Sequence, residues 1–470
     1  MSRAAEESKL ASWLCSEMLG ANELRALARA RGFPPPAGAK NQLAASVAVR
    51  LLEPIGVAEA MAQLDATWLA VLHLLAAAQD AVPLLDLASA LDPNRDRYSV
   101  DARRLWRLAA EGLLTKGVAL ADEAALPPRY EKSRFARLRL LVPADFRRFL
   151  PPFPLASLPT RTPGETGRLT DVLRAAFAAF LSRPPVAKAP TPTDLAGRLA
   201  AHFKLDDGQL SLAGAARPTP ELALRHAAVC WEAGLEHGGR FAAPVPAGSM
   251  AHHILAHLPA DHACTPKALA KGLAGLGIQV PPASVADFCA QGTAAGLLLR
   301  YPVSNGEALF AAAKQPLAPP ANDEALALAP HRGGVRLNVK DSAVLAVLRA
   351  ATVARATIDD GEMLLEPDPV RLGRAWDDAD TVRTATALGA VSPAFASAAR
   401  QVAERHGQVV VHQGLTVLRI ADVGLLALLR TRFPTDVREL GHRHLAVVRE
   451  RVDDVLAAAR KEGFTPRRAT

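Results

Sequence analysis

Apolar and polar positions along this chain recur mostly at helical spacing, which predicts a mainly α protein with brief β-rich runs between its helices. The clearest pattern begins at Ser392 and Pro393, a pair typical of a helix N-terminus, and helical spacing then continues toward Gly407. Two β-rich runs, Val409–Val411 and Leu415–Ile420, predict a hairpin.

Asp422 follows that hairpin and is placed to cap a second helix, Val423–Arg430. The tail predicts an amphipathic helix over Leu445–Glu462. No residue of this helix–hairpin–helix region has a catalytic pattern. We therefore expect the region to present a surface rather than to perform chemistry.

Residues 56–150 have the pattern of a winged helix. Helices are predicted at Thr67–Gln79, Leu84–Leu91 and Val100–Gly112. β-rich pieces follow around Leu113–Leu120 and Phe135–Val142. Three helices followed by a two-stranded ribbon is the element order of a winged helix.

Two further helix sets follow, over residues 166–245 and 246–315. Their predicted helices are Leu169–Leu181, Thr193–Phe203, Pro220–Gly234, Met250–Leu258, Pro266–Leu276 and Ser284–Ala295. The second set ends in a hairpin with a Ser304-Asn305-Gly306 turn. All three third helices end alike, in LAAEGLLTKG, WEAGLEHGG and TAAGLLLRY, so we interpret the sets as a degenerate internal repeat.

Two proline-rich stretches, Leu150–Glu165 and Gln315–Gly334, predict linkers. The expected domains are therefore 1–55, 56–150, 166–245, 246–315 and 335–470. The fold class that we expect is mainly α with α+β character. It consists of tandem winged-helix-like modules with short β-hairpins and a C-terminal helix-hairpin-helix domain.

Composition fits a globular protein of the cytoplasm. Of the 470 residues, 50% are hydrophobic, but the longest apolar stretch, Ala66–Leu91, is interrupted by His73 and Asp80 and cannot span a bilayer. The N-terminus has no apolar signal core. The four cysteines, Cys15, Cys230, Cys264 and Cys289, form no CxxC pair, which fits a reducing compartment.

A formal net charge of +8 makes a polyanion the most economical partner. Six basic residues of the first winged-helix module are the candidate contacts, from its third helix and its wing: Arg103, Arg104, Arg107, Lys132, Arg134 and Arg137, with Arg139 at the end of the wing. In a DNA-binding winged helix these positions meet the groove and the backbone. The alternatives are a solvated arginine face over a core of Leu105 and Trp106, or a protein-docking module.

The N-terminal segment Asn22–Val47 predicts two short helices joined by a proline-containing turn. It resembles the SAP module of DNA-associated proteins at seven positions: Leu24, Leu27, Arg31, Gly32, Gly38, Lys40 and Leu43. The resemblance implies that Gly38, Lys40 and Asn41 face DNA phosphates. The alternative is a helical hairpin with an ordinary solvated lysine.

The C-terminal region Glu362–Pro466 resembles a non-catalytic domain found in relatives of XPB-type DNA helicases. The resemblance rests on LLEPD from Leu364, the helix start at Ser392, the run Val409–Leu426 and EGFTP from Glu462. LLEPDPVRLG stands where the family usually has a strand rich in valine and glutamine. The resemblance implies an accessory protein, because the chain has no GxxxxGK[ST] loop of a helicase motor.

Enzyme signatures are also missing, with no GxSxG, HExxH or GxGxxG sequence. One cluster suggests a metal: His252, His253, His257, His262 and Cys264. His253 and His257 are spaced i, i+4, so both can face one ion. Three or four convergent ligands are needed, and we therefore expect ordinary helix surface rather than a metal site.

The sequence thus predicts a non-enzymatic, DNA-binding or helicase-associated accessory protein of the cytoplasm. Its expected partners are DNA and a helicase or other protein, with no membrane, cofactor or small-molecule substrate. One alternative is a scaffold that docks a helicase or polymerase subunit through its winged helices. A second is a sequence-specific transcriptional regulator, which would need a dimer matched to palindromic half-sites.

Overall fold

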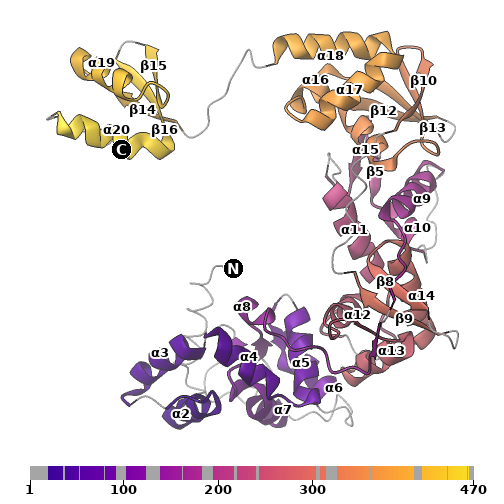
Figure 1. Cartoon of the computed structure of the whole chain (residues 1–470), viewed down its shortest axis with the longest axis vertical. Coiled ribbons are helices and arrows are strands. Elements are labelled where there is room, and N and C mark those ends of the chain that lie inside the picture. Colours follow the sequence, from indigo (N-terminus) through magenta and orange to yellow (C-terminus); the bar gives the residue numbers. More distant parts are fainter. Residues whose placement is uncertain are drawn as a thin grey trace. The chain divides into compact units, whose positions relative to one another are not determined.

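The structure is a computed structural model (Figure 1). It describes residues 20–34, 37–51, 53–78, 80–91, 102–122, 138–160, 162–182, 194–215, 220–239, 243–302, 307–313, 325–359, 362–406, 415–441, 443–462 and 464. The chain divides into two compact units, Met1–Arg400 and Gln401–Thr470. The fold is mixed α+β, with short helices and several small antiparallel sheets, and the finer division into five domains stays a prediction.

The first unit begins with helices α2 (Ala21–Ala30), α3 (Lys40–Leu51) and α4 (Pro54–Ala62). Helices α2 and α3 are the two that the N-terminal pattern predicted. Leu24 and Leu43 are fully buried between them, as their spacing requires. Gly32 has a φ of 72° directly after α2, a backbone conformation that glycine adopts without a steric penalty.

The next segment combines helices with a three-stranded sheet. Its elements are α5 (Ala66–Ala77), β1 (Val82–Pro83), η1 (Leu84–Leu87), α6 (Ala88–Leu91), α7 (Ala102–Ala109), η3 (Ala110–Leu114), β2 (Leu120–Asp122), β3 (Arg139–Leu141) and α8 (Ala144–Arg147). The antiparallel strand order is β1-β3-β2. The predicted ribbon is thus a sheet with a third strand, and residues 113–114, expected as strand, continue α7 as a π-helical turn.

The proline-rich stretch after α8 is extended, as predicted, but it is held along its length by later residues. Its strand β4 (Leu158–Pro159) pairs with β7 (His262–Ala263). The Phe153 amide donates to His257 and the Glu165 amide to Arg300, each at 2.7 Å. A Cβ at Gly167 would lie 2.3 Å from the Ala294 carbonyl oxygen, so this close approach requires glycine.

The following segment contains α9 (Leu169–Leu181), α10 (Leu195–Ala200), β5 (Phe203–Asp206), β6 (Gln209–Leu212) and α11 (Pro220–Glu232). The helices were predicted and the hairpin was not. Asp207 and Gly208 form its turn with φ values of 49° and 70°, the positive pair typical of a type I′ turn. The hairpin lies between the second and third helices of this set, whereas β2 and β3 of the preceding segment follow α7.

Residues 247–312 follow the predicted order closely. The elements are α12 (Ala247–Ala256), β7, α13 (Pro266–Gly275), α14 (Pro282–Ala294), β8 (Leu298–Pro302) and β9 (Ala308–Ala312). Cys264 forms an isolated antiparallel β-bridge with Phe310 of β9. The similar helix ends are not alike in backbone, because Gly296 has a φ of 76° whereas Gly112 lies within the π-helical turn.

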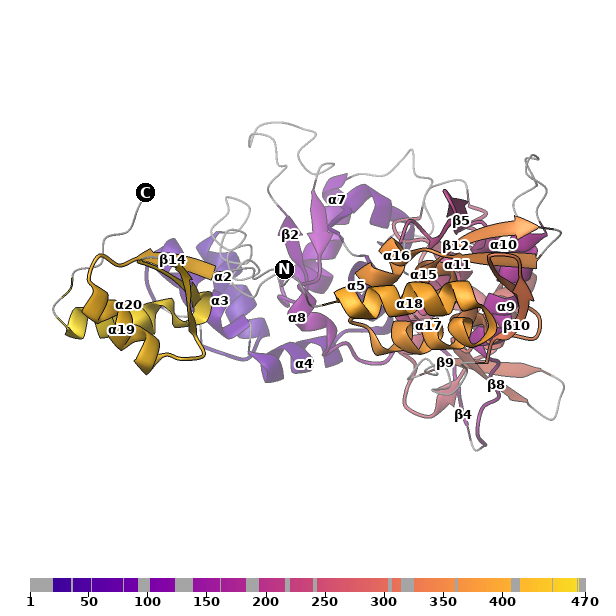
Figure 2. The same ribbon diagram turned by 90° about the horizontal axis from the view of Figure 1, so that it is seen from above.

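The last part of the first unit is a four-stranded antiparallel sheet with helices, in the order β10-β11-β13-β12. Its elements are β10 (Ala327–His331), β11 (Gly334–Asn338), α15 (Val344–Val353), β12 (Ala354–Asp359), β13 (Glu362–Pro367), α16 (Pro369–Arg374), α17 (Ala379–Val391) and α18 (Pro393–Arg405), whose last five residues belong to the second unit. The predicted linker Gln315–Gly334 was wrong in its second half, where β10 turns into β11. Helices α17 and α18 lie side by side (Figure 2), and α18 begins at Pro393 as predicted.

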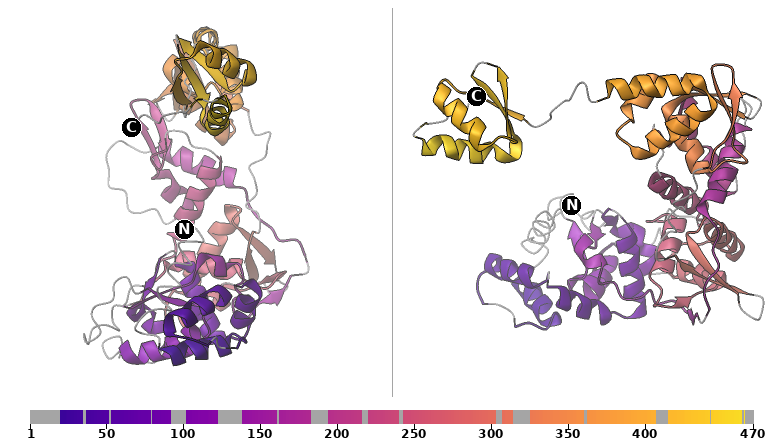
Figure 3. Two further views of the ribbon diagram at one scale, coloured as in Figure 1. Left: turned by 90° about the vertical axis from the view of Figure 1, so that its left-hand side faces the viewer. Right: turned by 45° about the horizontal axis from the view of Figure 1, so that its top comes forward.

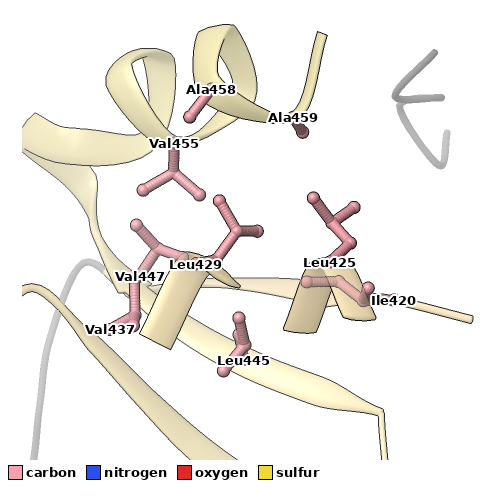
Figure 4. Packing of buried hydrophobic residues seen from close by; sticks show 9 residues of the cluster. All are labelled: Ile420, Leu425, Leu429, Val437, Leu445, Val447, Val455, Ala458 and Ala459. Carbon is pink, nitrogen blue, oxygen red and sulfur yellow. The ribbon is translucent and has the colours of Figure 1, made fainter. Parts of the chain in front are cut away.

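The second unit contains β14 (Leu415–Arg419), α19 (Val423–Arg432), β15 (Val437–Gly441), β16 (His444–Val448), η5 (Arg449–Arg451) and α20 (Val452–Lys461). Two helices lie on one side of a sheet of order β14-β16-β15 (Figure 3). Leu425 and Leu429 of α19 and Val455 of α20 pack on Leu445 and Val447 of β16 (Figure 4).

The three predictions for this unit have different outcomes. The Asp422 cap is confirmed, since its carboxylate accepts from the Leu425 amide at 2.7 Å. Residues 445–448, expected as helix, lie in β16, because the buried side chains of Leu445, Ala446 and Val447 complete the sheet beneath both helices. The predicted strand Val409–Val411 lies outside the described residues, and β14 pairs with β16. None of the helices in the described part of the chain is long and apolar enough to cross a membrane.

Candidate functional site

The N-terminal hairpin places Lys40 and Asn41 at the start of α3. Lys40 is half-buried and Asn41 is exposed, and Gly38 precedes them with a φ of 129°. Backbone amides at a helix start favour anions. The predicted phosphate contact at this turn stays a prediction.

Arg31, another position of the SAP resemblance, has a structural role. Its Nη2 donates to the Leu51 carbonyl at 2.8 Å and its Nη1 to the Lys116 carbonyl at 3.4 Å. Burial lowers the Arg31 pKa to about 10, although Glu53 and Glu59 oppose the shift. Arg31 therefore joins the end of α2 to the end of α3 and to the turn after η3.

Helix α7 is strongly amphipathic. Leu105 and Ala109 are buried, whereas Arg104 and Arg107 are exposed and three residues apart, so they share the outer face of the helix. The Arg103 side chain lies outside the part of the chain that the structure describes. The exposed face of α7 is the clearest basic surface among the predicted contacts.

The predicted wing is described only at its end. Arg139 of β3 is exposed and points away from Leu138 and Leu140, which are buried on either side of it. Lys132, Arg134 and Arg137 lie outside the described residues. Of the predicted DNA-contact residues, the structure therefore describes the side chains of Lys40, Asn41, Arg104, Arg107 and Arg139.

A second cluster joins two distant helices. His73 of α5 is fully buried and meets His253 of α12 and His257, the C-cap residue of the same helix. The His73 Nδ1 atom is 3.0 Å from His253 Nε2. One ring nitrogen of each of the three residues lies within 4.8 Å of those of the other two. His253 and His257 turn toward His73, so the expectation of ordinary helix surface was wrong for them.

Hydrogen bonds to carbonyl groups fix the tautomers of two rings. His73 Nε2 donates to the Pro151 carbonyl at 2.9 Å, which leaves the lone pair of the neutral ring on Nδ1. His257 Nδ1 donates to the His253 carbonyl at 2.8 Å, which leaves its lone pair on Nε2. Because His73 Nδ1 has a lone pair, it accepts the hydrogen bond, and His253 Nε2 carries the proton and donates it.

His73 and His253 are neutral at physiological pH. Burial lowers the His73 pKa to about 4, with a further contribution from His257. Burial lowers the His253 pKa to about 2, and the neighbouring histidines and Arg147 contribute in the same direction. Arg147 itself donates to the Ala78 carbonyl at 3.3 Å.

A cavity of about 650 Å³ opens beside the cluster, with His253 and His257 in its wall. Asp80 and Glu232 supply acidic groups to the same wall. The Glu232 carboxylate accepts from Ser249 and contacts His252 Nδ1, each at 2.7 Å. Burial opposes ionisation of Glu232, but these hydrogen bonds outweigh it and lower the carboxyl pKa.

The cluster found in the sequence therefore contained two of the three residues that meet, His253 and His257, and lacked the third. His262 contacts the Ala260 carbonyl and Cys264 forms an isolated β-bridge with Phe310, and the group of three convergent rings includes neither of them. His73 was missed as a partner, although a histidine inside the apolar run Trp68–Ala78 is a signal for a buried polar contact.

No model of a known protein family matches this chain, and no curated protein matches it either.

Proposed function

We propose that this chain is a non-enzymatic DNA-binding or helicase-associated accessory protein that contacts the phosphate backbone. One observation carries the proposal, the exposed face of α7 with Arg104 and Arg107 over the buried Leu105 and Ala109. Arginine at an exposed helix face suits phosphate, which it binds in a bidentate manner. The net charge of +8 supports a polyanionic partner.

The topology around α7 supports a winged helix. Residues 66–141 run helix, strand, helix, helix, strand, strand, with the strand order β1-β3-β2. In this arrangement α7 has the position of the groove-facing third helix, and strands β2 and β3 have the position of the wing. Residues 247–312 repeat the element order, which supports a second module of the same kind.

The sequence resemblance to XPB-type helicase relatives and to SAP modules implies an accessory role for this activity. Lys40 and Asn41 would add a second backbone contact at the start of α3. Because phosphate contacts carry no sequence information, we propose sequence-tolerant binding.

Docking of a protein, such as a helicase subunit, is the second candidate. The second unit exposes several large apolar side chains: Val417 by 55%, Val423 by 67% and Leu440 by 57%. Apolar side chains on a small unit are typical of an interaction surface when they are contiguous.

Fluorescence anisotropy tests the proposal with labelled single-stranded, duplex and forked DNA over a range of salt concentrations. Removal of two phosphate contacts by Arg104→Ala and Arg107→Ala should make the slope of log K against log salt shallower by about 1.8 on duplex DNA. Arg225→Ala and Arg332→Ala, two exposed arginines elsewhere in the first unit, are the control for loss of charge.

The control double variant should keep the wild-type slope. Absence of binding to every DNA at low salt contradicts the proposal and leaves docking as the better candidate. Equal losses in both double variants would show that net charge, rather than α7, carries the affinity.

A further inference from the structure

We propose that His73, His253 and His257 form a binding site for a divalent transition metal, Zn²⁺ first among them, with one coordination position open to the adjoining cavity. The site lies at the contact between α5 and α12, outside the proposed DNA-binding surface. It is independent of the proposed function.

The spacing of the three rings fits a metal centre. His253 and His257 are one helical turn apart, so α12 presents both to the same point, and α5 brings His73 from the facing helix. Their ring nitrogens already lie within 4.8 Å of one another. Tetrahedral ligand atoms bound at about 2.0 to 2.1 Å stand roughly 3.4 Å apart. Ring rotations that move each ligand nitrogen by about 1 Å therefore complete the site.

The hydrogen bonds around the rings are those of metal-binding histidines. Such ligands donate their other N–H group to a carbonyl or carboxylate, which fixes the ring and directs the lone pair at the ion. Pro151 and the carbonyl of His253 do this for His73 and His257. For His253 only a tautomeric shift is needed, in which the Nε2 proton moves to Nδ1 of the same ring.

The ligand set selects the class of metal. Three neutral imidazoles suit Zn²⁺, Co²⁺, Ni²⁺ or Cu²⁺ and do not suit Mg²⁺ or Ca²⁺, which prefer oxygen ligands. Three protein ligands leave a fourth position for water or a small ligand. That position faces the cavity, whose volume of about 650 Å³ is within the range of small-molecule sites.

The test uses the full chain without a histidine tag, stripped with a chelator and then titrated with Co²⁺ and Zn²⁺. We expect one equivalent of Co²⁺ to give the visible absorption of a tetrahedral complex and one equivalent of Zn²⁺ to displace it. His257→Ala and His253→Ala should each weaken binding by about 100-fold or more, since loss even of an outer partner costs about 10- to 100-fold.

His262→Ala is the matched control, because His262 lies close in sequence and its ring contacts the Ala260 carbonyl instead of the cluster. It should bind like the wild type. Circular dichroism checks that each variant is folded.

X-ray absorption of the wild-type zinc complex decides the question even if a variant does not fold. Three imidazole ligands without sulfur support the site. Sulfur ligation, fewer than two imidazoles, no stoichiometric binding, or undiminished binding in folded His253→Ala and His257→Ala proteins would overturn the proposal. The three rings would then be a hydrogen-bonded contact between two helices.

Discussion

Trp231 of α11 is the side chain whose loss should most disturb the helices around the cavity. It is fully buried, and its ring stacks on Phe288 of α14 with centroids 4.2 Å apart. The indole Nε1 donates to the Phe288 carbonyl at 2.7 Å. The edge of the ring meets His252 of α12, so one side chain joins three helices.

Trp231→Phe keeps a six-membered aromatic ring but removes the indole N–H donor and part of the ring volume. The lost hydrogen bond costs about 1 kcal/mol. The lost ring volume and stacking cost about 1 to 2 kcal/mol more, because α11, α12 and α14 cannot close the space without moving. We therefore expect the free energy of local opening to fall by about 2 to 3 kcal/mol, which is a 30- to 150-fold larger open population at about 1.4 kcal/mol per tenfold.

Three buried thiols on α11, α14 and the residue after β7 report this opening. Cys230, Cys264 and Cys289 are at most 2% exposed. Burial raises all three thiol pKa values, so the closed state offers neither access nor thiolate. In a Cys15→Ser background, labelling by a disulfide reagent at mildly alkaline pH therefore measures opening, and Trp231→Phe should label roughly 30 to 150 times faster.

Trp376→Phe is the control, since Trp376 lies just after α16 and is only half-buried. It should leave the labelling rates unchanged. If Trp231→Phe labels within threefold of the parent protein, the stacked and hydrogen-bonded tryptophan does not hold these helices together and the reasoning is refuted.

Two further predictions concern polar contacts. Arg371 donates to the Asp207, Gly208 and Ala354 carbonyls at 2.6 to 3.1 Å, and a lysine cannot reach all three, so Arg371→Lys should weaken this contact by about 2 kcal/mol. Amide exchange of residues 354–359 should then be roughly 30-fold faster, whereas the control Arg349→Lys should change the exchange rate little. Equal exchange rates in the wild type, Arg371→Lys and Arg349→Lys would contradict this role of Arg371. The lowered pKa of Glu232 means that the unfolded chain binds its proton first, so stability should fall as pH drops below about 4.5. Glu232→Gln should lack this part of the acid transition in tryptophan fluorescence, and an identical transition would refute the assignment.

Local signals in the sequence predicted many elements of this fold. Pro393 begins α18, and Asp422 caps α19, because both effects depend on neighbouring backbone groups. The β5–β6 hairpin also had a local signal in Asp207-Gly208 between alternating apolar residues, which helical spacing upstream obscured. Residues 445–448 satisfied a helical pattern but became β16, because strand pairing with β14 and β15 overrides a weak local preference.

The histidine cluster could be predicted only in part. The i, i+4 spacing of His253 and His257 marks one helix face in the sequence. The third ring is 180 positions from His253 and reaches it only through the packing of α5 on α12. No pattern of neighbouring residues in a single sequence indicates a contact between such distant positions, and only the folded chain brings the three rings together.

The extended segment after α8 has a consequence for biosynthesis. Its partners are synthesised much later, since Thr160 bonds to Asp261, 101 positions on, and Thr166 to Leu298, 132 positions on. At about 5 to 20 residues per second the ribosome needs on the order of ten seconds to deliver them. Phe153, 3% exposed in the finished protein, must wait for α12 during that time. The segment is thus a nascent-chain stretch whose native partners are absent until residues 257–300 have been made, and faster elongation shortens this period.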